Sequence, residues 1–128
     1  MLRAAVADAG AGVKDVDYIN AHGTGTKNND ETEAAIIGRV FGDSVRINST
    51  KSLLGHTIGA SGAFEILVTA LSLRDQRTHI CRNLDTPVRD LNFVRTTEQF
   101  DLRVGLSQSF AFGGHNAAVV LRRYTPGG

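Results

Sequence analysis

Residues 15–41 read DVDYINAHGTGTKNNDETEAAIIGRVF and decide the fold. Residues 16–21 are a short run rich in β-branched and aromatic side chains, which predicts a buried strand. The HGTGT segment that follows is too rich in glycine for regular structure. Asp30 is then expected to cap the N-terminus of a helix, with Glu33 at the third helical position in a capping box. The stretch therefore predicts a strand, a glycine-rich loop and a helix that ends near Gly42.

The rest of the chain continues the same alternation. The expected elements are a helix over 2–10, a strand over 45–49, a glycine-interrupted loop over 51–59, a helix over 60–74 with Ala63, Leu67, Ala70 and Leu71 on one face, and strands over 102–112 and 117–124. Residues 76–98 are expected to be irregular. A Gly-Gly turn between the last two strands predicts an antiparallel hairpin. The order predicts an α/β fold with a mixed sheet covered by helices.

Composition limits the classes of function. Of the 128 residues, 41% are hydrophobic and 21% are charged, and the net charge is +1. The basic residues form no stripe, which argues against a nucleic-acid partner. The single cysteine excludes an internal disulfide and suits a reducing compartment. Because no apolar run is long enough for a signal peptide or a membrane span, we expect a cytoplasmic protein without a membrane partner.

Two loops in corresponding places, each between a strand and a helix, carry His22 and His56. In open α/β sheets, ligands bind outside the carboxyl ends of the strands, so both loops are expected to open toward one site. In the first loop, glycines let the backbone approach a ligand and the hydroxyls of Thr24 and Thr26 can donate hydrogen bonds. An ordinary strand-to-helix turn is the alternative interpretation.

The second loop carries Lys51 five residues before His56. An ammonium beside an imidazole disfavours the imidazolium, so Lys51 is expected to help keep His56 neutral. Glu65, in the helix that follows, is a candidate partner for Lys51. A surface lysine, a loop histidine and a solvated glutamate remain the alternative for these three residues.

A third motif, FAFGGHN, occupies residues 110–116. Its two phenylalanines could simply be core at the end of a hairpin. Alternatively, the turn could present a backbone N–H to an oxyanion, with Phe112 gating the pocket. Three histidines without HxH or HExxH spacing predict no metal site. Cys81 lacks a glycine elbow or helix start that would lower its pKa, so it is interpreted as an incidental thiol.

Together, three segments closely resemble the β-ketoacyl-[acyl carrier protein] synthases, or ketosynthases, of fatty-acid and polyketide synthesis. The segments are DVDYINAHGTGTKNNDETEA (15–34), INSTKSLLGHTIGASGAFE (47–65) and SQSFAFGGHNAAVVL (107–121). The resemblance is nearest to the synthase II type and the related polyketide enzymes. It implies the C-terminal half of a thiolase-like fold, with residues 1–128 as one incomplete domain.

The resemblance also implies roles for individual residues. Catalytic roles fall on His22, His56, Lys51, Glu65 and Phe112, and contacts with the pantetheine arm or the acyl group fall on Thr24, Thr26, Phe110, Phe112 and Asn116. His115 stands where the family more often has threonine. The resemblance implies decarboxylative condensation of an acyl thioester with malonyl-carrier protein. It implies no cofactor and no metal, since the substrates are carried on the phosphopantetheine of the carrier.

The nucleophilic cysteine of the resembled family lies in its N-terminal half, upstream of the HGTGT loop. We therefore expect this chain to be inactive alone and to need a partner chain or N-terminal half, acyl carrier protein, and dimerisation of the complete enzyme. A non-catalytic partner of the chain-length-factor kind is the alternative, and a carrier-binding module is a third interpretation. Retention of His22, Lys51 and His56 together argues against the first of these alternatives. The SFAFGGHN turn argues against the second, because a carrier-binding module needs no oxyanion turn.

Overall fold

A computed structural model describes residues 1–127 of the chain. The helices are α1 (Leu2–Asp8), α2 (Lys27–Phe41), α3 (Lys51–Leu54) and α4 (Ser61–Asp75), and the strands are β1 (Tyr18–Asn20), β2 (Arg46–Asn48), β3 (Val104–Phe110) and β4 (Asn116–Arg122). Short 3-10 turns lie at Val13–Asp15, Ile58–Ala60 and Phe112–Gly114. The predicted order of helices and strands is confirmed, and α3 is a short helix inside the segment expected to be a loop.

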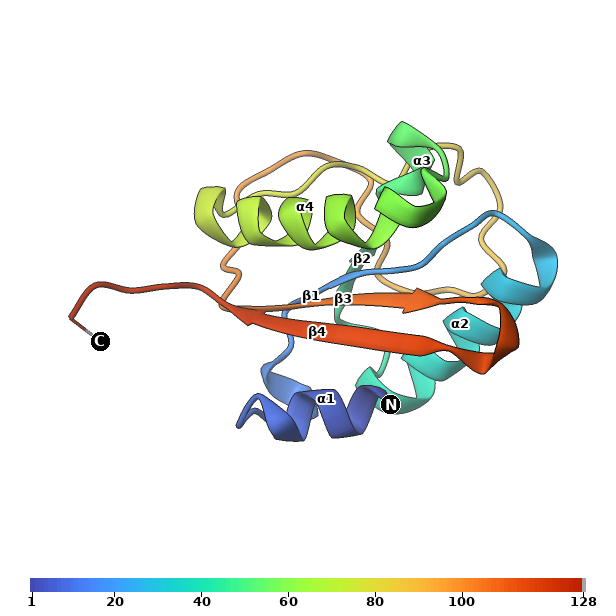
Figure 1. The fold of residues 1–128 in the computed structure, drawn as a ribbon. Helices are drawn as coiled ribbons and strands as arrows, with labels where there is room; N and C mark the ends of the chain where they lie inside the picture. The colour runs from blue at the N-terminus through green and yellow to red at the C-terminus, as the bar shows by residue number, and fades with distance from the viewer. Residues whose placement is uncertain (128) are drawn as a thin grey trace.

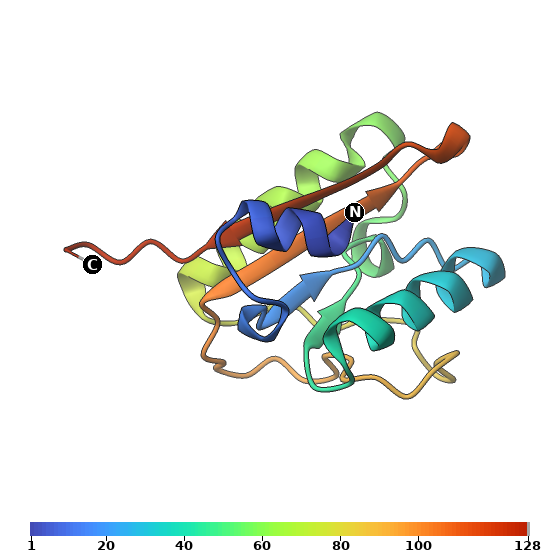
Figure 2. The same ribbon diagram turned by 90° about the horizontal axis from the view of Figure 1, so that it is seen from below.

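The strands form one mixed sheet in the order β2-β1-β3-β4. β1 is parallel to both β2 and β3, while β3 and β4 form the predicted antiparallel hairpin. Figures 1 and 2 show α4 on one face of the sheet and α1 and α2 on the other. Because β1 and β2 are parallel neighbours, the loops that follow them leave the same edge of the sheet. The expectation that both loops open toward one site is confirmed.

The face covered by α1 and α2 holds the main apolar core. Its fully buried side chains come from β1, β2, β3 and the two helices, and they include Val6, Ile19, Ile37, Ile47 and Leu106. The opposite face has a small apolar cluster at one end, formed by Tyr18, Leu73 and Leu102. The two faces of the sheet therefore differ: one supplies apolar packing, and the other holds polar side chains near the loops.

Helix α4 buries several polar side chains and exposes several large apolar ones, while Leu73 at its C-terminal end is buried. Glu65 and Thr69 are buried against the sheet, whereas Phe64, Leu67 and Leu71 are exposed, Leu67 at 55%. The apolar face predicted from Ala63, Leu67, Ala70 and Leu71 is thus turned away from this sheet. An exposed apolar helix face of this kind marks an interaction surface.

The expected start of the second helix is wrong. Helix α2 begins at Lys27 with Thr26 as its N-cap residue, so Asp30 lies within the first turn and caps nothing. The Asp30 carboxylate accepts from the backbone N–H of Gly25 at 3.3 Å. Glu33 is not part of a capping box either, because its carboxylate bonds the loop after β1.

No helix within residues 1–127 is long and apolar enough to cross a lipid bilayer.

Gly105 on β3 tests the packing of α4 against the sheet. A Cβ at this position would lie 2.9 Å from Thr69 Cγ2 and 3.5 Å from two Leu73 carbons. We therefore expect Gly105→Ala to lower the free energy of unfolding by about 1–3 kcal/mol through overpacking. Gly62→Ala is the matched control, because its nearest contact would be an ordinary 3.7 Å to Ser109 Oγ. Denaturant unfolding of the two variants checks the difference, and equal stabilities would contradict it.

Candidate active site

The β1–α2 loop is held by the carboxylate of Glu33 on α2. Its Oε1 accepts from the backbone N–H of His22 at 2.6 Å, and its Oε2 accepts from that of Gly23 at 2.8 Å. Asn29 and Gln108 donate their side-chain amides to the same carboxylate, at 3.1 and 2.6 Å. Glu33 is only 4% exposed, so these bonds are shielded from water. A buried carboxylate with four donors fixes the backbone from which the His22 ring projects.

Glu33 was expected to cap a helix, and its hydrogen bonds to the backbone of the β1–α2 loop were not predicted. The signal that could have found them is spacing, since Glu33 follows His22 by eleven residues across one loop and less than two helical turns. Gln108 was not singled out either. Its Oε1 is buried with no partner within the described residues, while its Nε2 bonds Glu33.

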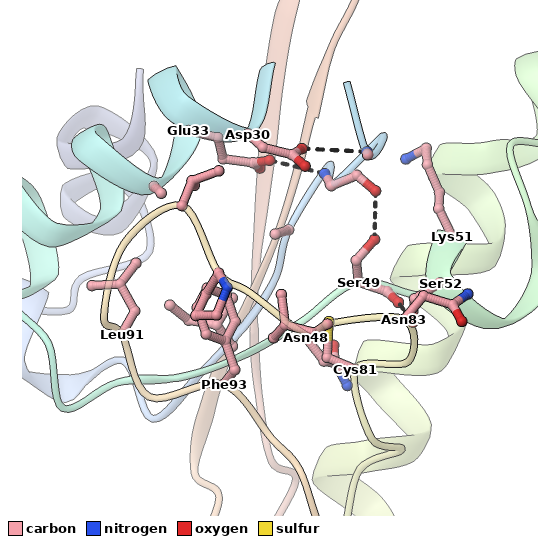
Figure 3. Close-up of a pocket in the computed structure, with 18 of the residues that line it drawn as sticks. Asp30, Glu33, Asn48, Ser49, Lys51, Ser52, Cys81, Asn83, Leu91 and Phe93 are labelled. Atoms are coloured by element: carbon pink, nitrogen blue, oxygen red, sulfur yellow. Dashed lines mark hydrogen bonds between the residues drawn. The ribbon is translucent and has the colours of Figure 1, made fainter. Parts of the chain in front are cut away.

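The loop is also fastened to the residue after β2. Ser49 Oγ donates to the Gly23 carbonyl at 2.9 Å. Gly23 has φ +48°, and a Cβ there would lie 2.4 Å from Ser49 Oγ, so only glycine fits. Behind this contact is a pocket of roughly 370 Å³, closed by α2 on one side and residues 81–93 on another. Figure 3 shows Ser49, Asp30 and Glu33 all bonded to the loop beside this pocket.

The ammonium of Lys51 joins the two histidine loops to α4. It donates to the His22 carbonyl at 2.7 Å, to His22 Nδ1 at 3.2 Å and to the carboxylate of Glu65. An ammonium has three protons and no acceptor, so these three contacts use it completely. The predicted pairing of Lys51 with Glu65 is confirmed. The lysine and glutamate side chains are 4% and 1% exposed, which makes this a buried ion pair.

The rings of His22 and His56 meet edge to face. Their centroids are 5.8 Å apart at an interplanar angle of 89°. Since Lys51 donates to His22 Nδ1, a neutral His22 carries its proton on Nε2. Ile58 donates its backbone N–H to His56 Nδ1 at 3.0 Å, so a neutral His56 also carries its proton on Nε2. The site thus offers two ring N–H donors from separate loops.

The acid–base state of His22 follows from its surroundings. Burial, then the ammonium of Lys51, then His56, together lower the pKa of His22 to about 4. The ammonium that was expected to act on His56 instead contacts His22, which corrects that part of the sequence interpretation. Burial also raises the pKa of Glu65, and Lys51 opposes that shift. His22 is thus a neutral ring at physiological pH, and because Lys51 occupies its Nδ1, it donates from Nε2.

The remaining predicted site residues lie in two places. The Phe110 ring is 5.7 Å from the His22 ring, also edge to face, so it belongs to this cluster. Thr24 and Thr26 share a 2.8 Å hydroxyl contact on the outer side of the loop. Phe112 is fully exposed at the tip of the β3–β4 hairpin. Asn116, also exposed, pairs with Phe110 at the base of the same turn.

Other groups fit a chemical role less well. Cys81 is half-buried beside the pocket, and burial raises the pKa of its thiol, which is opposite to what a nucleophile needs. Among residues 1–127, no three His, Cys, Asp or Glu side chains are arranged to hold a metal ion. The chemistry available here is therefore hydrogen-bond donation from the Nε2–H groups of two imidazole rings beside a buried ion pair.

Comparison with known proteins shows the family of this chain. The profile of the β-ketoacyl synthase C-terminal domain matches residues 1–85. The 3-oxoacyl-[acyl-carrier-protein] synthase 2 of Rhizobium meliloti (strain 1021) is 41% identical over 97% of this chain. This chain belongs to the β-ketoacyl synthase family. It covers 31% of that relative, so it spans about a third of the length of the ketosynthases it matches.

Solved ketosynthases share the same architecture. The ishigamide ketosynthase/chain length factor superimposes with a TM-score of 0.91 at 37% identity, over 97% of this chain and 32% of that one. A type II polyketide ketosynthase bound to a hexaketide, solved in complex with its acyl-carrier protein, gives 0.91 at 31% identity, over 97% and 32%. The chain therefore has the thiolase-like ketosynthase fold, in the C-terminal half of that fold.

The bonds of Glu33 to the loop predict a specific sensitivity. In Glu33→Gln, the amide N–H₂ must face one of the two loop N–H groups, which leaves a buried donor unpaired. We expect the free energy of unfolding to fall by about 1–3 kcal/mol. Glu31→Gln is the matched control on the exposed side of the same helix. Denaturant unfolding of both variants checks this. An unchanged stability of Glu33→Gln would contradict the hydrogen bonds assigned to the Glu33 carboxylate.

The protonation of His22 can be measured directly. Histidine-labelled nuclear magnetic resonance is expected to show a His22 midpoint near pH 4, with the proton on Nε2 above it. Because an unfolded histidine titrates near 6.5, unfolded chains bind the extra proton between those values. Stability should then fall as pH drops from 6.5 to 4, by at most about 1.4 kcal/mol per pH unit. Lys51→Met should raise the midpoint, and a wild-type midpoint above 6.5 would contradict the assignment.

Proposed function

We propose that the protein carrying this chain is a 3-oxoacyl-[acyl-carrier-protein] synthase that condenses an acyl thioester with malonyl-carrier protein and releases CO2. The observation that carries the proposal is the pair of Nε2–H donors of His22 and His56, on rings 5.8 Å apart. Support also comes from relatives, since the Rhizobium meliloti protein carries this name at 41% identity. Catalysis by such a site is the stabilisation of an oxyanion by aimed donors.

The reaction begins with the malonyl thioester. Its C–C bond to the carboxylate breaks, CO2 leaves, and the electron pair forms an enolate whose negative charge lies on the thioester oxygen. His22 and His56 donate their Nε2–H groups to that oxygen. The enolate carbon then attacks the acyl thioester held on a cysteine, and the cysteine thiolate leaves. The product is a β-ketoacyl chain two carbons longer on the carrier.

Lys51 and Glu65 support this step without taking part in proton transfer. Lys51 donates all three of its protons, and two of them go to His22, at its carbonyl and Nδ1. The ammonium thus keeps the tautomer of His22 with its proton on Nε2. Glu65 supplies the negative charge that makes a buried ammonium tolerable.

The hairpin and the threonine loop complete the proposed site. The backbone N–H at Phe112 is proposed to serve the acyl oxyanion, with the ring as a gate. Thr24 and Thr26 are proposed to bind the pantetheine arm of the carrier, while Phe110 and Asn116 line the acyl side. Phosphopantetheine on the carrier brings both substrates. The comparison structure with a bound acyl-carrier protein supports a carrier partner of the same kind.

The nucleophile and the partner surface belong to the same proposal. The resemblance assigns the cysteine to the N-terminal half of the family, and Cys81 is a poor substitute because burial raises its pKa. We assign residues 1–128 to the C-terminal domain, inactive without that half. The exposed apolar side chains of α4, Phe64, Leu67 and Leu71, are the proposed contact with it. The complete enzyme is proposed to act as a dimer.

Decarboxylation is the step that tests the histidine pair. In the full-length protein that carries this chain, His22→Ala and His56→Ala should each slow the release of CO2 from malonyl-carrier protein by about 10²–10³-fold, the usual effect of removing one oxyanion donor. Acylation of the cysteine should be partly retained, because it does not use the enolate. Labelled CO2 release and acyl-enzyme mass spectrometry measure the two half-reactions separately.

The acylation half-reaction is the internal control for folding. Undiminished CO2 release in both variants would refute the proposed roles. If the wild-type protein neither releases CO2 nor becomes acylated, but lengthens the products of a separate ketosynthase, it is a chain-length-factor-like partner.

A further inference from the structure

The segment between α4 and β3 contains a histidine that none of the three motifs includes. His79 is half-buried, and both of its ring nitrogens are bonded. Its Nδ1 lies 2.8 Å from the carbonyl oxygen of Ile80, and its Nε2 lies 3.1 Å from Thr50 Oγ1. Thr50 directly precedes Lys51, so this ring contacts the residue next to the central lysine of the site.

The backbone around His79 is fixed. The side-chain amide of Asn48 on β2 donates to the His79 carbonyl at 2.8 Å and to Thr78 Oγ1 at 2.7 Å. Two residues further along, the N–H of Cys81 donates to the Val94 carbonyl at 2.8 Å. The ring therefore projects toward Thr50 from a segment whose backbone is held by hydrogen bonds, although the segment has no regular secondary structure.

The direction of each hydrogen bond follows from the partners. The Ile80 carbonyl can only accept, so His79 Nδ1 carries a proton. In the neutral ring, Nε2 then has a lone pair, and the Thr50 hydroxyl donates to it. That leaves the lone pairs of Thr50 Oγ1 for the amide of Asn20, which donates at 2.8 Å. Burial lowers the pKa of His79, which agrees with the neutral ring.

Thr50 and Asn20 connect this ring to the ion pair. The Thr50 N–H donates to Asn20 Oδ1 at 3.4 Å, and Asn20 Nδ2 also reaches the Glu65 carbonyl at 3.2 Å. Asn20 and Thr50 are 0% and 3% exposed, so water does not replace a lost partner. The chain of bonds thus runs from His79 through Thr50 and Asn20 to the backbone of Glu65.

We propose that His79 is a positioning residue, which orients the Thr50 hydroxyl and thereby fixes Lys51 and Glu65 around His22. The inference rests on the proposed function for its kinetic consequences, but its geometry does not. Without the acceptor at Nε2, the Thr50 hydroxyl rotates to donate to another group. In that orientation its oxygen is no longer well placed to accept the hydrogen bond from Asn20. The start of α3 then shifts, and Lys51 moves relative to His22 Nδ1.

Two substitutions distinguish the contributions of Nδ1 and Nε2 of His79. In His79→Gln, the side-chain amide reaches the place of Nε2 and can still accept from Thr50. In His79→Asn, the shorter amide reaches only the place of Nδ1. In the full-length protein that carries this chain, we expect the Asn variant to lower kcat about tenfold with KM for malonyl-carrier protein unchanged, since small misplacements are costly. The Gln variant should retain most of kcat.

A second readout does not depend on turnover. In His79→Asn the His22 midpoint, followed by histidine-labelled nuclear magnetic resonance, should rise because Lys51 is displaced; in His79→Gln it should stay near that of the wild type. Adding His79→Asn to Thr50→Val should cost nothing further, because both break the same bond. Arg77→Gln, an exposed change two residues away, is the control.

Equal kcat and equal His22 midpoints in the Asn and Gln variants would overturn the proposal, as would additive losses in the double variant. If His79→Asn does not fold, Thr50→Val and Thr50→Ser decide, because only serine keeps the hydroxyl. Equal behaviour of those two variants would also overturn it. If the wild-type protein catalyses no condensation, the proposed function fails, and the His22 midpoints still decide the place of His79.

Discussion

The ammonium of Lys51 is the constraint on which the site depends. It lies where three separate parts of the chain converge, and its three protons bond His22 twice and Glu65 once. Removing one partner of a buried ion pair typically costs about 3–5 kcal/mol, because the other charge is left unpaired. The loop after β1, the start of α3 and the first turns of α4 are therefore fixed relative to each other by electrostatics.

This constraint also explains why α4 is built with its polar side inward. A helix that packed only leucines against the sheet would have no place for Glu65, Ser61 or Thr69. Here Ser61 and Lys51 both contact the Glu65 carboxylate, and Thr69 donates to the Glu65 carbonyl at 2.7 Å. Phe64, Leu67 and Leu71 are left on the other side, where a second layer of protein can cover them, while Leu73 packs on the sheet. The proposed catalytic arrangement and the proposed partner surface are thus two sides of one helix.

The sequence predicted the order of elements well because each element follows a local rule. Strands β1 and β2 lie in short segments that contain valine and isoleucine, and the Gly-Gly turn led correctly to the hairpin. The pairing of Lys51 with Glu65 was also predicted, from their positions in the loop and the next helix and from the resemblance to the family. Parallel strands bring their following loops together, so His22 and His56 could be placed near one site before any coordinates.

Predictions failed where a side chain acts over a long distance in sequence. Asp30 and Glu33 have the spacing of a helix cap, but Glu33 bonds His22, Gly23 and Gln108, and Gln108 is 75 residues away. The apolar residues of α4 recur with helical periodicity, which predicts that they share one face of the helix. The periodicity does not predict whether that face points toward the sheet or away from it. His79 carries no motif at all, and its contact with Thr50 depends on how residues 76–98 cross the end of β2.

The same geometry limits which groups can move protons. If Lys51 gave a proton away, the Glu65 carboxylate would lose its bonded cation in a site with almost no water. The two Nδ1 atoms are occupied as acceptors, by Lys51 and by the Ile58 N–H. Only the Nε2–H groups remain available to a ligand, and the low pKa of His22 keeps that ring from acting as an imidazolium acid. A site of this kind stabilises negative charge by donation, which is what the enolate of the proposed reaction requires.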